Sequence, residues 1–441
     1  NNGACRALAG DVMCPSYRVT REERDVTRGR ANSLRLAVTG QLGPDAFTSG
    51  EMARTLSLCV SCKACRRECP TGVDMARMKI EVLCARRKRF GLTLHDRLVG
   101  WLPRYAPHAA RLSWLLNLRD ALPGGAILSE AMAGFSARRS LPRWRSDWFK
   151  DSEPAPRLAR EGGVGHAASY APAALAPSGA LRASASPASR GGEREVVLFA
   201  DTFNRYFERE NLDAALTVFA AGGYRVTVAT PLDGSSRPLC CGRTFLSIGA
   251  VDEARAEAAR TLAALAPFVA RGVPVVGLEP SCILGFRDEI PAIVQDARAA
   301  ALATQALNFE EFLARDAEAG RLDLRLGPIA RRALLHGHCH QKSFDAFAPV
   351  ATVLRLVPGL KVEPIESSCC GMAGAFGYAA ETIDVSLAMG ELSLLPAVRK
   401  APADALIVAD GTSCRHQIKD GAGRPALHVA RVLAMSLAAA P

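Results

Sequence analysis

The stretch Cys59-Val60-Ser61-Cys62-Lys63-Ala64-Cys65-Arg66-Arg67-Glu68-Cys69-Pro70 decides the fold and the chemistry of the first part of the chain. Its spacing is C-x2-C-x2-C-x3-C-P. Three thiolates on such a tight loop reach three irons of one cubane cluster, whereas the fourth, which precedes proline, commonly ligates a second cluster. A tetrahedral zinc site is the competing interpretation, but zinc usually draws two C-x2-C pairs from separate turns. The run therefore predicts 4Fe-4S binding.

The N-terminus supplies part of the partner motif that this run requires. Cys14-Pro15 repeats its C-P ending, and Cys5 lies shortly before. We expect Cys14 to complete the cubane of the first three cysteines of the run, and Cys69 to join Cys5 at a second cluster. Because the chain opens without Met and inside this motif, we interpret the sequence as a fragment and expect a further cysteine upstream of Asn1. Alternatively, Cys5 is a free thiol and only one cluster forms.

A second cysteine pattern occurs twice in the C-terminal part. Cys240-Cys241-Gly242 recurs as Cys369-Cys370-Gly371, and each copy is followed by a single cysteine, Cys282 or Cys414. Apolar runs typical of buried strands at 196–200, 225–229 and 273–278 alternate with helical stretches at 212–221 and 251–270. The sequence thus predicts two copies of one α/β unit, with the single cysteines just past a strand end, where open α/β sheets commonly bind ligands.

The two copies differ in the number of thiols that they offer. The second has four, Cys339, Cys369, Cys370 and Cys414, which suffice for a cluster or a closed zinc site. The first has only Cys240, Cys241 and Cys282, because aligning residues 198–202 with 335–339 places Thr202 opposite Cys339. Buried structural cysteines at the CCG turns are the alternative. His336, His338 and His340 flank Cys339, but alternate residues of a strand face opposite ways, so we interpret most of them as structural.

The positive charge of the chain is concentrated in one segment. The net charge of the 441 residues is +11, and residues 1–150 carry 26 Lys and Arg against 13 Asp and Glu, so the remainder carries a net charge of −2. A basic segment can bind an acidic partner, nucleic acid or an anionic membrane surface. We find no nucleic-acid-binding module, no apolar run long enough to span a membrane and no secretory signal. We therefore expect a cytoplasmic protein that is a candidate for peripheral binding to the inner face of a bacterial plasma membrane.

These patterns predict an α+β multidomain protein, with an all-helical ferredoxin-like 4Fe-4S domain followed by a duplicated α/β cysteine-rich (CCG) domain. Residues 151–194 are rich in Ala, Ser, Pro and Gly, which is typical of a flexible linker. The expected parts, in chain order, are a helical 4Fe-4S domain at 1–95, a basic helical extension at 96–150, the linker at 151–194, the first CCG unit at 195–330 and the second CCG unit at 331–441.

The sequence also resembles a known family. Met13-Cys14-Pro15-Ser16-Tyr17 and Thr27-Arg28-Gly29-Arg30-Ala31-Asn32 resemble the iron-sulfur half of fused FAD-linked oxidases of the D-lactate or D-2-hydroxyglutarate dehydrogenase type. The CCG units resemble the cysteine-rich domains of the glycolate oxidase iron-sulfur subunit, of the C subunit of anaerobic glycerol-3-phosphate dehydrogenase and of the B subunit of heterodisulfide reductase. The resemblance implies an FAD-binding domain or subunit that oxidises a 2-hydroxy acid to a 2-oxo acid and a quinone-type acceptor for the electrons. No catalytic residue is expected in this chain.

Three functions follow as hypotheses. The first is electron transfer from FAD through 4Fe-4S clusters to a quinone or another membrane acceptor. The second is a thiol-disulfide oxidoreductase of the heterodisulfide reductase type, with a CCG cluster as its catalytic centre. The third is a zinc-stabilised scaffold that binds partners through its basic face. A purified 4Fe-4S protein is brown and bleaches on reduction, whereas a zinc protein is colourless, so colour separates the third hypothesis from the first two.

Overall fold

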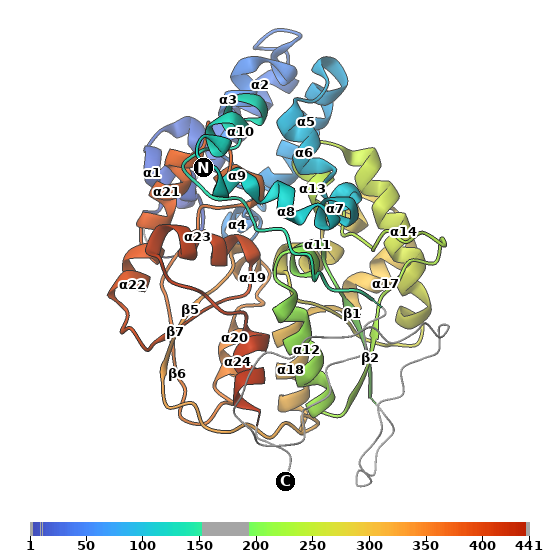
Figure 1. The fold of residues 1–441 in the computed structure, drawn as a ribbon. Helices are drawn as coiled ribbons and strands as arrows, with labels where there is room; N and C mark the ends of the chain where they lie inside the picture. The colour runs from blue at the N-terminus through green and yellow to red at the C-terminus, as the bar shows by residue number, and fades with distance from the viewer. Residues whose placement is uncertain (1–2, 9, 11, 152–193, 438–441) are drawn as a thin grey trace.

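The computed structural model describes residues 3–8, 10, 12–151 and 194–437. The chain has a mixed α/β fold with an N-terminal helical region and two parallel sheets (Figure 1). The α/β architecture expected after the linker is therefore confirmed. The predicted linker, residues 151–194, lies outside the described residues except for its two end residues, Asp151 and Arg194.

The N-terminal region consists of short helices that begin at recognisable caps. The Asp74 side chain accepts a hydrogen bond from the Arg77 amide at the start of α5, and Thr93 forms a capping box with Asp96 at the start of α6. The helices of this region are η1 (Ala4–Arg6), α1 (Pro15–Thr20), η2 (Glu23–Asp25), α2 (Thr27–Val38), η3 (Ala46–Thr48), α3 (Gly50–Ser57), α4 (Ala64–Glu68), α5 (Met75–Phe90), α6 (Leu94–Gly100), α7 (Leu102–Arg111), α8 (Ser113–Leu116), α9 (Leu118–Ala121) and α10 (Gly125–Ala133).

The prediction of a helical extension through residue 150 was wrong for its last part. Helix α10 is followed by its C-cap Gly134, which has φ +72°, a conformation that favours glycine. The next segment is not helical, and Phe135 forms an antiparallel bridge with Ala379. The buried Arg139 donates to Gly377 O at 2.8 Å and to Gln417 Oε1 at 2.6 Å. The segment is extended because it binds along the second α/β unit, a tertiary interaction that local helical periodicity cannot indicate.

The first sheet has four parallel strands in the order β2-β1-β3-β4. The strand prediction was correct: Val197 of β1 pairs with Thr227 of β2 and with Val275 of β3. The elements of this unit are β1 (Arg194–Phe199), α11 (Thr202–Tyr206), α12 (Arg209–Ala221), β2 (Tyr224–Val228), α13 (Arg243–Ser247), α14 (Val251–Val269), β3 (Val275–Gly277), α15 (Pro280–Ile283), η4 (Leu284–Arg287), α16 (Glu289–Ile293), α17 (Ala297–Gln305), β4 (Ala306–Asn308) and α18 (Phe309–Glu318).

The second sheet has three parallel strands in the order β6-β5-β7, which is the same arrangement as β2-β1-β3. Leu334 of β5 pairs with Glu363 of β6 and with Ile407 of β7. The elements of this unit are β5 (Arg332–His336), α19 (Cys339–Ser343), α20 (Ala348–Leu354), β6 (Lys361–Pro364), η5 (Gly374–Gly377), α21 (Ile383–Glu391), α22 (Leu394–Lys400), β7 (Leu406–Ala409), α23 (Thr412–Ala422) and α24 (Val429–Ser436).

The two sheets share one core. Helices α12 and α18 of the first unit pack against α24 and α20 of the second, between the sheets (Figure 1). Buried side chains from both sheets join this core, among them Leu198, Val276, Leu335 and Val408. The helical region lies over the carboxyl ends of the strands, since α6 contacts α13, α7 contacts α11 and α4 contacts α19. The cysteines that follow the strands are therefore enclosed between the helical region and the sheets.

Candidate metal centres

Four of the predicted ligands line one pocket in the helical region. Cys14, Cys59, Cys62 and Cys65 line this pocket together with apolar residues such as Met75. Cys14 is the N-cap of α1 and precedes Pro15, Cys59 and Cys62 lie on the loop between α3 and α4, and Cys65 lies in α4. Four thiols around an apolar pocket form the donor set that a cubane requires. The fold thus places Cys14 beside Cys59, Cys62 and Cys65, the arrangement that we expected for the ligands of one cubane.

The protonation of these thiols depends on what occupies the pocket. Burial raises the pKa of Cys14 to about 11 and that of Cys65 to about 12, so without a cation both groups would stay protonated. A bound metal reverses this preference because its positive charge favours the thiolate. The pocket also offers polar partners for sulfur, since the Met75 amide donates to Cys65 Sγ at 3.4 Å and Thr27 Oγ1 lies 2.9 Å from Cys14 Sγ.

The loop that carries the thiols is strained and is held by the rest of the protein. Ser61 and Lys63, on either side of Cys62, have φ of +51° and +64°. Each such non-glycine residue costs about 1 kcal/mol or more and persists where its surroundings fix it. His340 Nε2 lies 3.1 Å from Ser61 O, and Ser343 Oγ lies 2.9 Å from Cys62 O.

Three cationic side chains approach the pocket from different elements. Arg30 is 2% exposed and donates to Ser16 Oγ and Thr55 O. Lys79 donates to the carbonyl oxygen of Cys59 at 2.6 Å, and burial lowers its pKa. A cluster bound by four thiolates is anionic, so such cations stabilise it and influence its reduction potential.

The third cation, Lys63, links the loop to the first α/β unit. It is 1% exposed, and its Nζ lies 2.5 Å from Asp288, 3.2 Å from Asp74 and 3.3 Å from Glu289. Asp288 also forms ion pairs with Arg66 and Arg77. The pairing of Lys63 with a residue 225 positions away could not be recognised in the sequence.

Cys5 and Cys69 are not among the residues that line this pocket, although they pack in the same core as its cysteines. Helix η1, which contains Cys5, contacts α4, whose C-cap is Cys69. The Glu68 carboxylate accepts hydrogen bonds from the Val12 and Met13 amides at 2.9 Å and so holds the N-terminal segment beside α4. Burial alone would raise the pKa of Cys69, but hydrogen bonds from Thr71 and nearby amides outweigh it and lower the pKa. The assignment of these two thiols to a second cluster stays a prediction.

The second α/β unit gathers its four thiols at the ends of its strands. Cys339 begins α19 after β5, Cys369 and Cys370 follow β6, and Cys414 lies in α23 after β7. All four are buried. The Gly371 amide donates to Cys369 Sγ at 3.4 Å, and the neighbouring Cys369 and Cys414 thiols lower the pKa of Cys370. The unit therefore holds a continuous set of four potential thiolate ligands.

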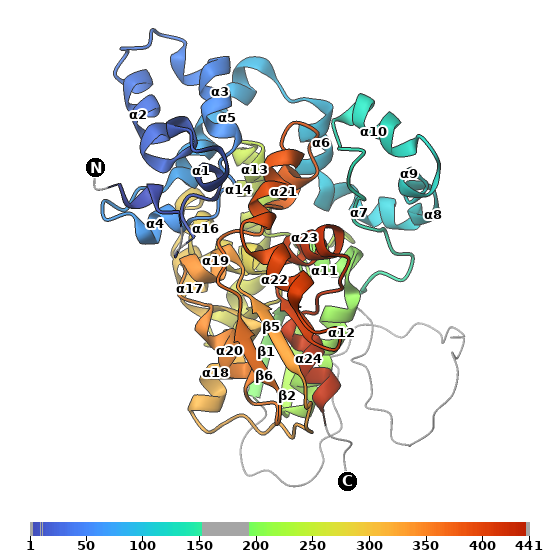
Figure 2. The same cartoon turned by 90° about the vertical axis from the view of Figure 1, so that its left-hand side faces the viewer.

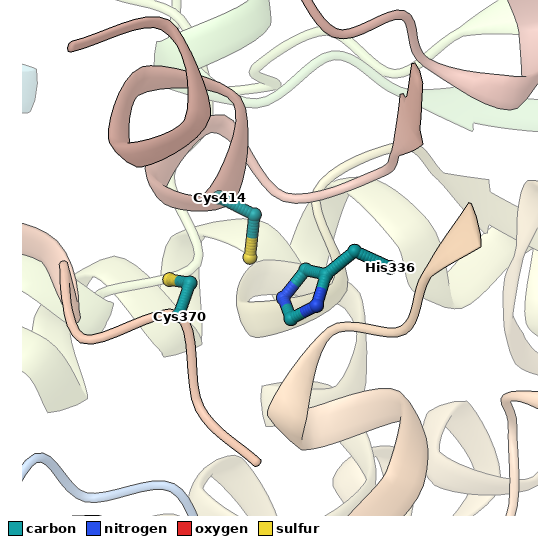
Figure 3. Close-up of side chains that lie close together, drawn as sticks. All are labelled: His336, Cys370 and Cys414. Atoms are coloured by element: carbon teal, nitrogen blue, oxygen red, sulfur yellow. The ribbon is translucent and has the colours of Figure 1, made fainter. Parts of the chain in front are cut away.

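His336, the last residue of β5, adds a fifth potential ligand to this set. Its ligand nitrogen and the sulfurs of Cys370 and Cys414 lie within 4.8 Å of one another, and Figure 3 shows its ring beside the two thiols. Nδ1 lies 2.8 Å from Ser367 Oγ, whereas Nε2 has no hydrogen-bond partner among the described residues. A buried imidazole nitrogen without a partner is costly unless it binds something, and a metal-binding His is usually oriented through its other nitrogen.

The three histidines around Cys339 therefore have different roles. His338 caps α19 and accepts from the His340 amide at 3.1 Å, and His340 contacts the loop of the first pocket. Their interpretation as structural residues agrees with these contacts. The sequence did not single out His336 as a ligand, because what distinguishes it is an Nε2 atom without a hydrogen-bond partner in the described part of the folded protein. A usable sequence signal was its position three residues before Cys339, in the stretch that aligns with residues 198–202 of the first unit.

The glycine of each CCG motif is required by the backbone. Gly371 has φ +91°, and a Cβ there would lie 2.3 Å from Ser386 O. Gly242 has φ +78°, and a Cβ there would lie 3.2 Å from Ala254 O. Only glycine fits both the left-handed conformation and the close approach at Gly371, so the turn that presents the paired cysteines depends on it.

The first unit has a smaller set of ligands. Cys241 Sγ and Cys282 Sγ lie 3.0 Å apart, and the Gly242 amide donates to Cys240 Sγ at 3.3 Å. Thr202 begins α11 where Cys339 begins α19, and Phe199 ends β1 where His336 ends β5. The Phe199 ring packs against Phe286 at 5.0 Å. This unit therefore has an apolar contact and a hydroxyl where the second unit has an imidazole and a thiol.

A further buried group consists of Glu310, Asp410 and His428. These residue types can bind a metal, but the protonation of His428 does not suit a metal ligand. His428 Nδ1 accepts from the Ala430 amide at 3.0 Å, so Nε2 carries the proton, and it lies 3.1 Å from Leu278 O. Neither nitrogen is then available to a metal. Burial, together with the negative charge of Asp410, raises the pKa of Glu310 well above its usual value. We interpret this group as a carboxylic acid beside a carboxylate in the shared core.

Comparisons with known proteins agree with the helical site. Residues 1–73 match the family model described as the 4Fe-4S dicluster domain. The chain is 28% identical to D-2-hydroxyglutarate dehydrogenase of Pseudomonas putida over 472 residues, which covers 98% of this chain and 42% of that protein. It is also 28% identical to the C subunit of anaerobic glycerol-3-phosphate dehydrogenase of Escherichia coli K12 over 204 residues, 46% of this chain and 50% of that protein.

A third relative matches over most of both lengths. The protein described as "Probable glycolate oxidase iron-sulfur subunit" of Bacillus subtilis is 22% identical over 94% of this chain and 87% of its own length. The chain is thus homologous to the C-terminal part of D-2-hydroxyglutarate dehydrogenase and to these two subunits, as the resemblance of its motifs predicted. It spans about two fifths (42%) of the length of the D-2-hydroxyglutarate dehydrogenases that it matches. It is an iron-sulfur electron-transfer module related to oxidoreductases, and the dicluster match indicates 4Fe-4S clusters.

Proposed function

We propose that this chain is the electron-transfer portion of a flavin-linked 2-hydroxy-acid dehydrogenase of the D-lactate, glycolate or D-2-hydroxyglutarate type. The observation that carries the proposal is the convergence of Cys14, Cys59, Cys62 and Cys65 on one apolar pocket beside α19, the helix that begins with Cys339. The FAD would be bound by a part of the protein outside this chain or by a partner flavoprotein. The electrons would leave towards a quinone-type acceptor, at the cytoplasmic face of the membrane.

We assign the ligands as follows. Cys14, Cys59, Cys62 and Cys65 hold one 4Fe-4S cluster, and Cys69 and Cys5 belong to a second. Cys339, Cys369, Cys370 and Cys414, with His336 as an additional donor, hold a cluster or a zinc ion in the second α/β unit, which we take to be a second copy of the first. When bound, a 4Fe-4S cluster accepts and releases one electron at a time, and this is the chemistry that it supplies here.

The residues of the chain position these groups and set their surroundings. The helical region covers the carboxyl ends of both sheets, so most of the assigned thiols are buried, whereas Cys59 and Cys69 are partly exposed. Arg30, Lys63 and Lys79 provide positive charge around an anionic site. Exclusion of water and fixed charge are the means by which a protein adjusts a cluster potential. No side chain is required as an acid or a base for this step.

The proposal is tested on the chain prepared without oxygen. We expect iron and acid-labile sulfide to co-purify with it, a low-temperature electron paramagnetic resonance signal after reduction, and electron transfer from a reduced flavin to a short-chain quinone. The Cys84→Ser variant is the matched control, because Cys84 lies in α5 and is not among the assigned ligands. Zinc in place of iron would favour the scaffold hypothesis. Iron that is never reduced by reduced flavin would contradict the proposed direction of electron transfer.

A further inference from the structure

Helices α8, α9 and α10 and the turns beside them carry a group of large apolar side chains that face solvent. Trp114 and Ile127 are each 68% exposed and Met132 is 66% exposed. The others are Leu112, Leu115, Leu116, Leu122 and Leu128. We call these eight residues the α8–α10 surface. Figure 2 shows the three helices together at one side of the molecule, opposite α2 and the N-terminus. An exposed apolar group of this size marks a binding surface.

Two helices of this surface, α9 and α10, pack on each other and leave their apolar side chains outside the core. Neither α9 nor α10 contains a single buried residue. Helix α10 has the sequence Gly-Ala-Ile-Leu-Ser-Glu-Ala-Met-Ala and is only nine residues long. Helices of this length are not stable in water by their backbone alone and depend on the packing of an apolar face. The apolar face of α10 therefore requires something outside the described residues to cover it.

The charges around the surface indicate what covers it. The acidic residues of α9 and α10 have partners in the fold: Asp120 accepts from the Leu141 amide at 3.0 Å, and Glu130 accepts from the Ala137 amide at 2.5 Å. The exposed Arg111, immediately before the surface in sequence, and the exposed Arg143, shortly after it, have no ion-pair partner among the described residues. Apolar side chains with Trp and with cations that have no ion-pair partner form the pattern that binds anionic lipid headgroups.

We propose that the α8–α10 surface inserts into the headgroup region of a membrane that contains anionic lipids. The partner is the lipid surface itself. The apolar side chains would contact the outer part of the acyl chains, and the arginines would bind the anionic headgroups. Among the described residues, no helix is long and apolar enough to cross a bilayer. The inference deepens the proposed function and rests on it for its purpose, because a quinone acceptor resides in the bilayer.

The experiment measures binding of the metal-loaded chain to vesicles by co-sedimentation. Vesicles of phosphatidylcholine with phosphatidylglycerol are compared with vesicles of phosphatidylcholine alone. We expect binding to the anionic vesicles, a blue shift of tryptophan fluorescence that is absent in Trp114→Phe, and loss of binding as salt rises. The triple variant Ile127→Ser, Leu128→Ser, Met132→Ser should bind at least tenfold more weakly. The triple variant Val38→Ser, Leu232→Ser, Met435→Ser is the matched control, since these residues are exposed on other parts of the chain.

A second variant keeps the test decisive if the apolar variant folds poorly. Arg111→Gln with Arg143→Gln leaves the apolar residues intact and should lower binding to anionic vesicles selectively. Absence of vesicle binding by the wild-type chain, or equal binding by both triple variants, would overturn the inference. A dimer that the apolar variant dissociates, or capture of a flavoprotein that it abolishes, would assign the surface to a protein instead. Metal content and electron transfer to a water-soluble acceptor are measured in parallel, because their loss concerns the proposed function and not the surface.

Discussion

The hydroxyl oxygen of Ser343 lies 2.9 Å from the carbonyl oxygen of Cys62 and 2.8 Å from that of Cys339. One side chain thus contacts the backbone of a predicted cubane ligand and of a predicted ligand in the second α/β unit. The cluster loop and α19 are therefore positioned together, and a change that moves α19 is expected to move the loop.

The first prediction concerns Cys62 itself. Replacing it with Ser should remove the cubane of the first pocket, because a serine hydroxyl is a poor substitute for thiolate in iron-sulfur coordination. The measurement is iron and sulfide per chain with the reduced-state paramagnetic signal, and Cys84→Ser serves as the control. Unchanged iron content in Cys62→Ser would contradict the ligand assignment.

The second prediction concerns the difference between the two α/β units. Cys339→Ser should lose more bound metal than Cys282→Ser, since the second unit has four thiols and His336, whereas the first has three thiols with Thr202 and Phe199 at the other two positions. Metal content and melting temperature of both variants of the full chain, prepared without oxygen, test it. Equal losses would indicate one site shared by both units.

The third prediction tests His336 as a ligand. His336→Asn should lower the metal affinity of the second unit by roughly 10- to 100-fold, and Ser367→Ala should lower it less by releasing the orientation of the ring. His338→Asn is the control, because asparagine can also cap α19. A chelator titration followed by metal release measures the affinity. If His336→Asn and His338→Asn release metal alike, His336 is structural.

The fourth prediction concerns the buried ion group around Lys63. In Lys63→Met, Asp288 keeps its ion pairs with Arg66 and Arg77. The free energy of unfolding should therefore fall by at most roughly 3 kcal/mol, the loss typical of a broken buried ion pair. Denaturant unfolding of the metal-loaded chain measures it, with Arg54→Met as the exposed control.

The ion pairs of Asp288 also determine how the stability of the protein depends on pH. Burial raises the pKa of Asp288, but Lys63, Arg77 and Arg66 outweigh it and lower the pKa below its usual 3.8. A lowered pKa contributes stability that is present above the unfolded value and is lost as the pH falls towards the folded value. Lys63→Met should therefore lose less of its stability than the wild type on acidification below about pH 4. Equal acid sensitivity of the two proteins would show that Lys63 does not set the charge of Asp288.

The sequence indicated those parts of the molecule that depend on local spacing. The grouping of Cys59, Cys62 and Cys65 on one loop and the two CCG turns were predictable because their residues are close in sequence. The buried strands were predictable from apolar runs. Lys63 with Asp288, and the free Nε2 of His336, were not, because both depend on which distant side chains the fold brings close. The extended path of Arg139 along the second unit was missed for the same reason.

The last prediction concerns the acid in the shared core. Glu310 is 1% exposed beside Asp410, and burial raises its pKa well above 4.5. Above about pH 4.5 the unfolded chain has released the Glu310 proton, whereas the folded protein keeps it. The stability that protonated Glu310 contributes is therefore full below that pH and is lost as the pH rises towards the folded pKa. Glu310→Gln keeps the shape of the side chain and cannot ionise, so its melting temperature should fall less than that of the wild type between about pH 5 and pH 8. Glu51→Gln, at an exposed position of α3, is the control that should follow the wild type. Parallel pH curves for Glu310→Gln and the wild type would mean that Glu310 is already ionised in the fold.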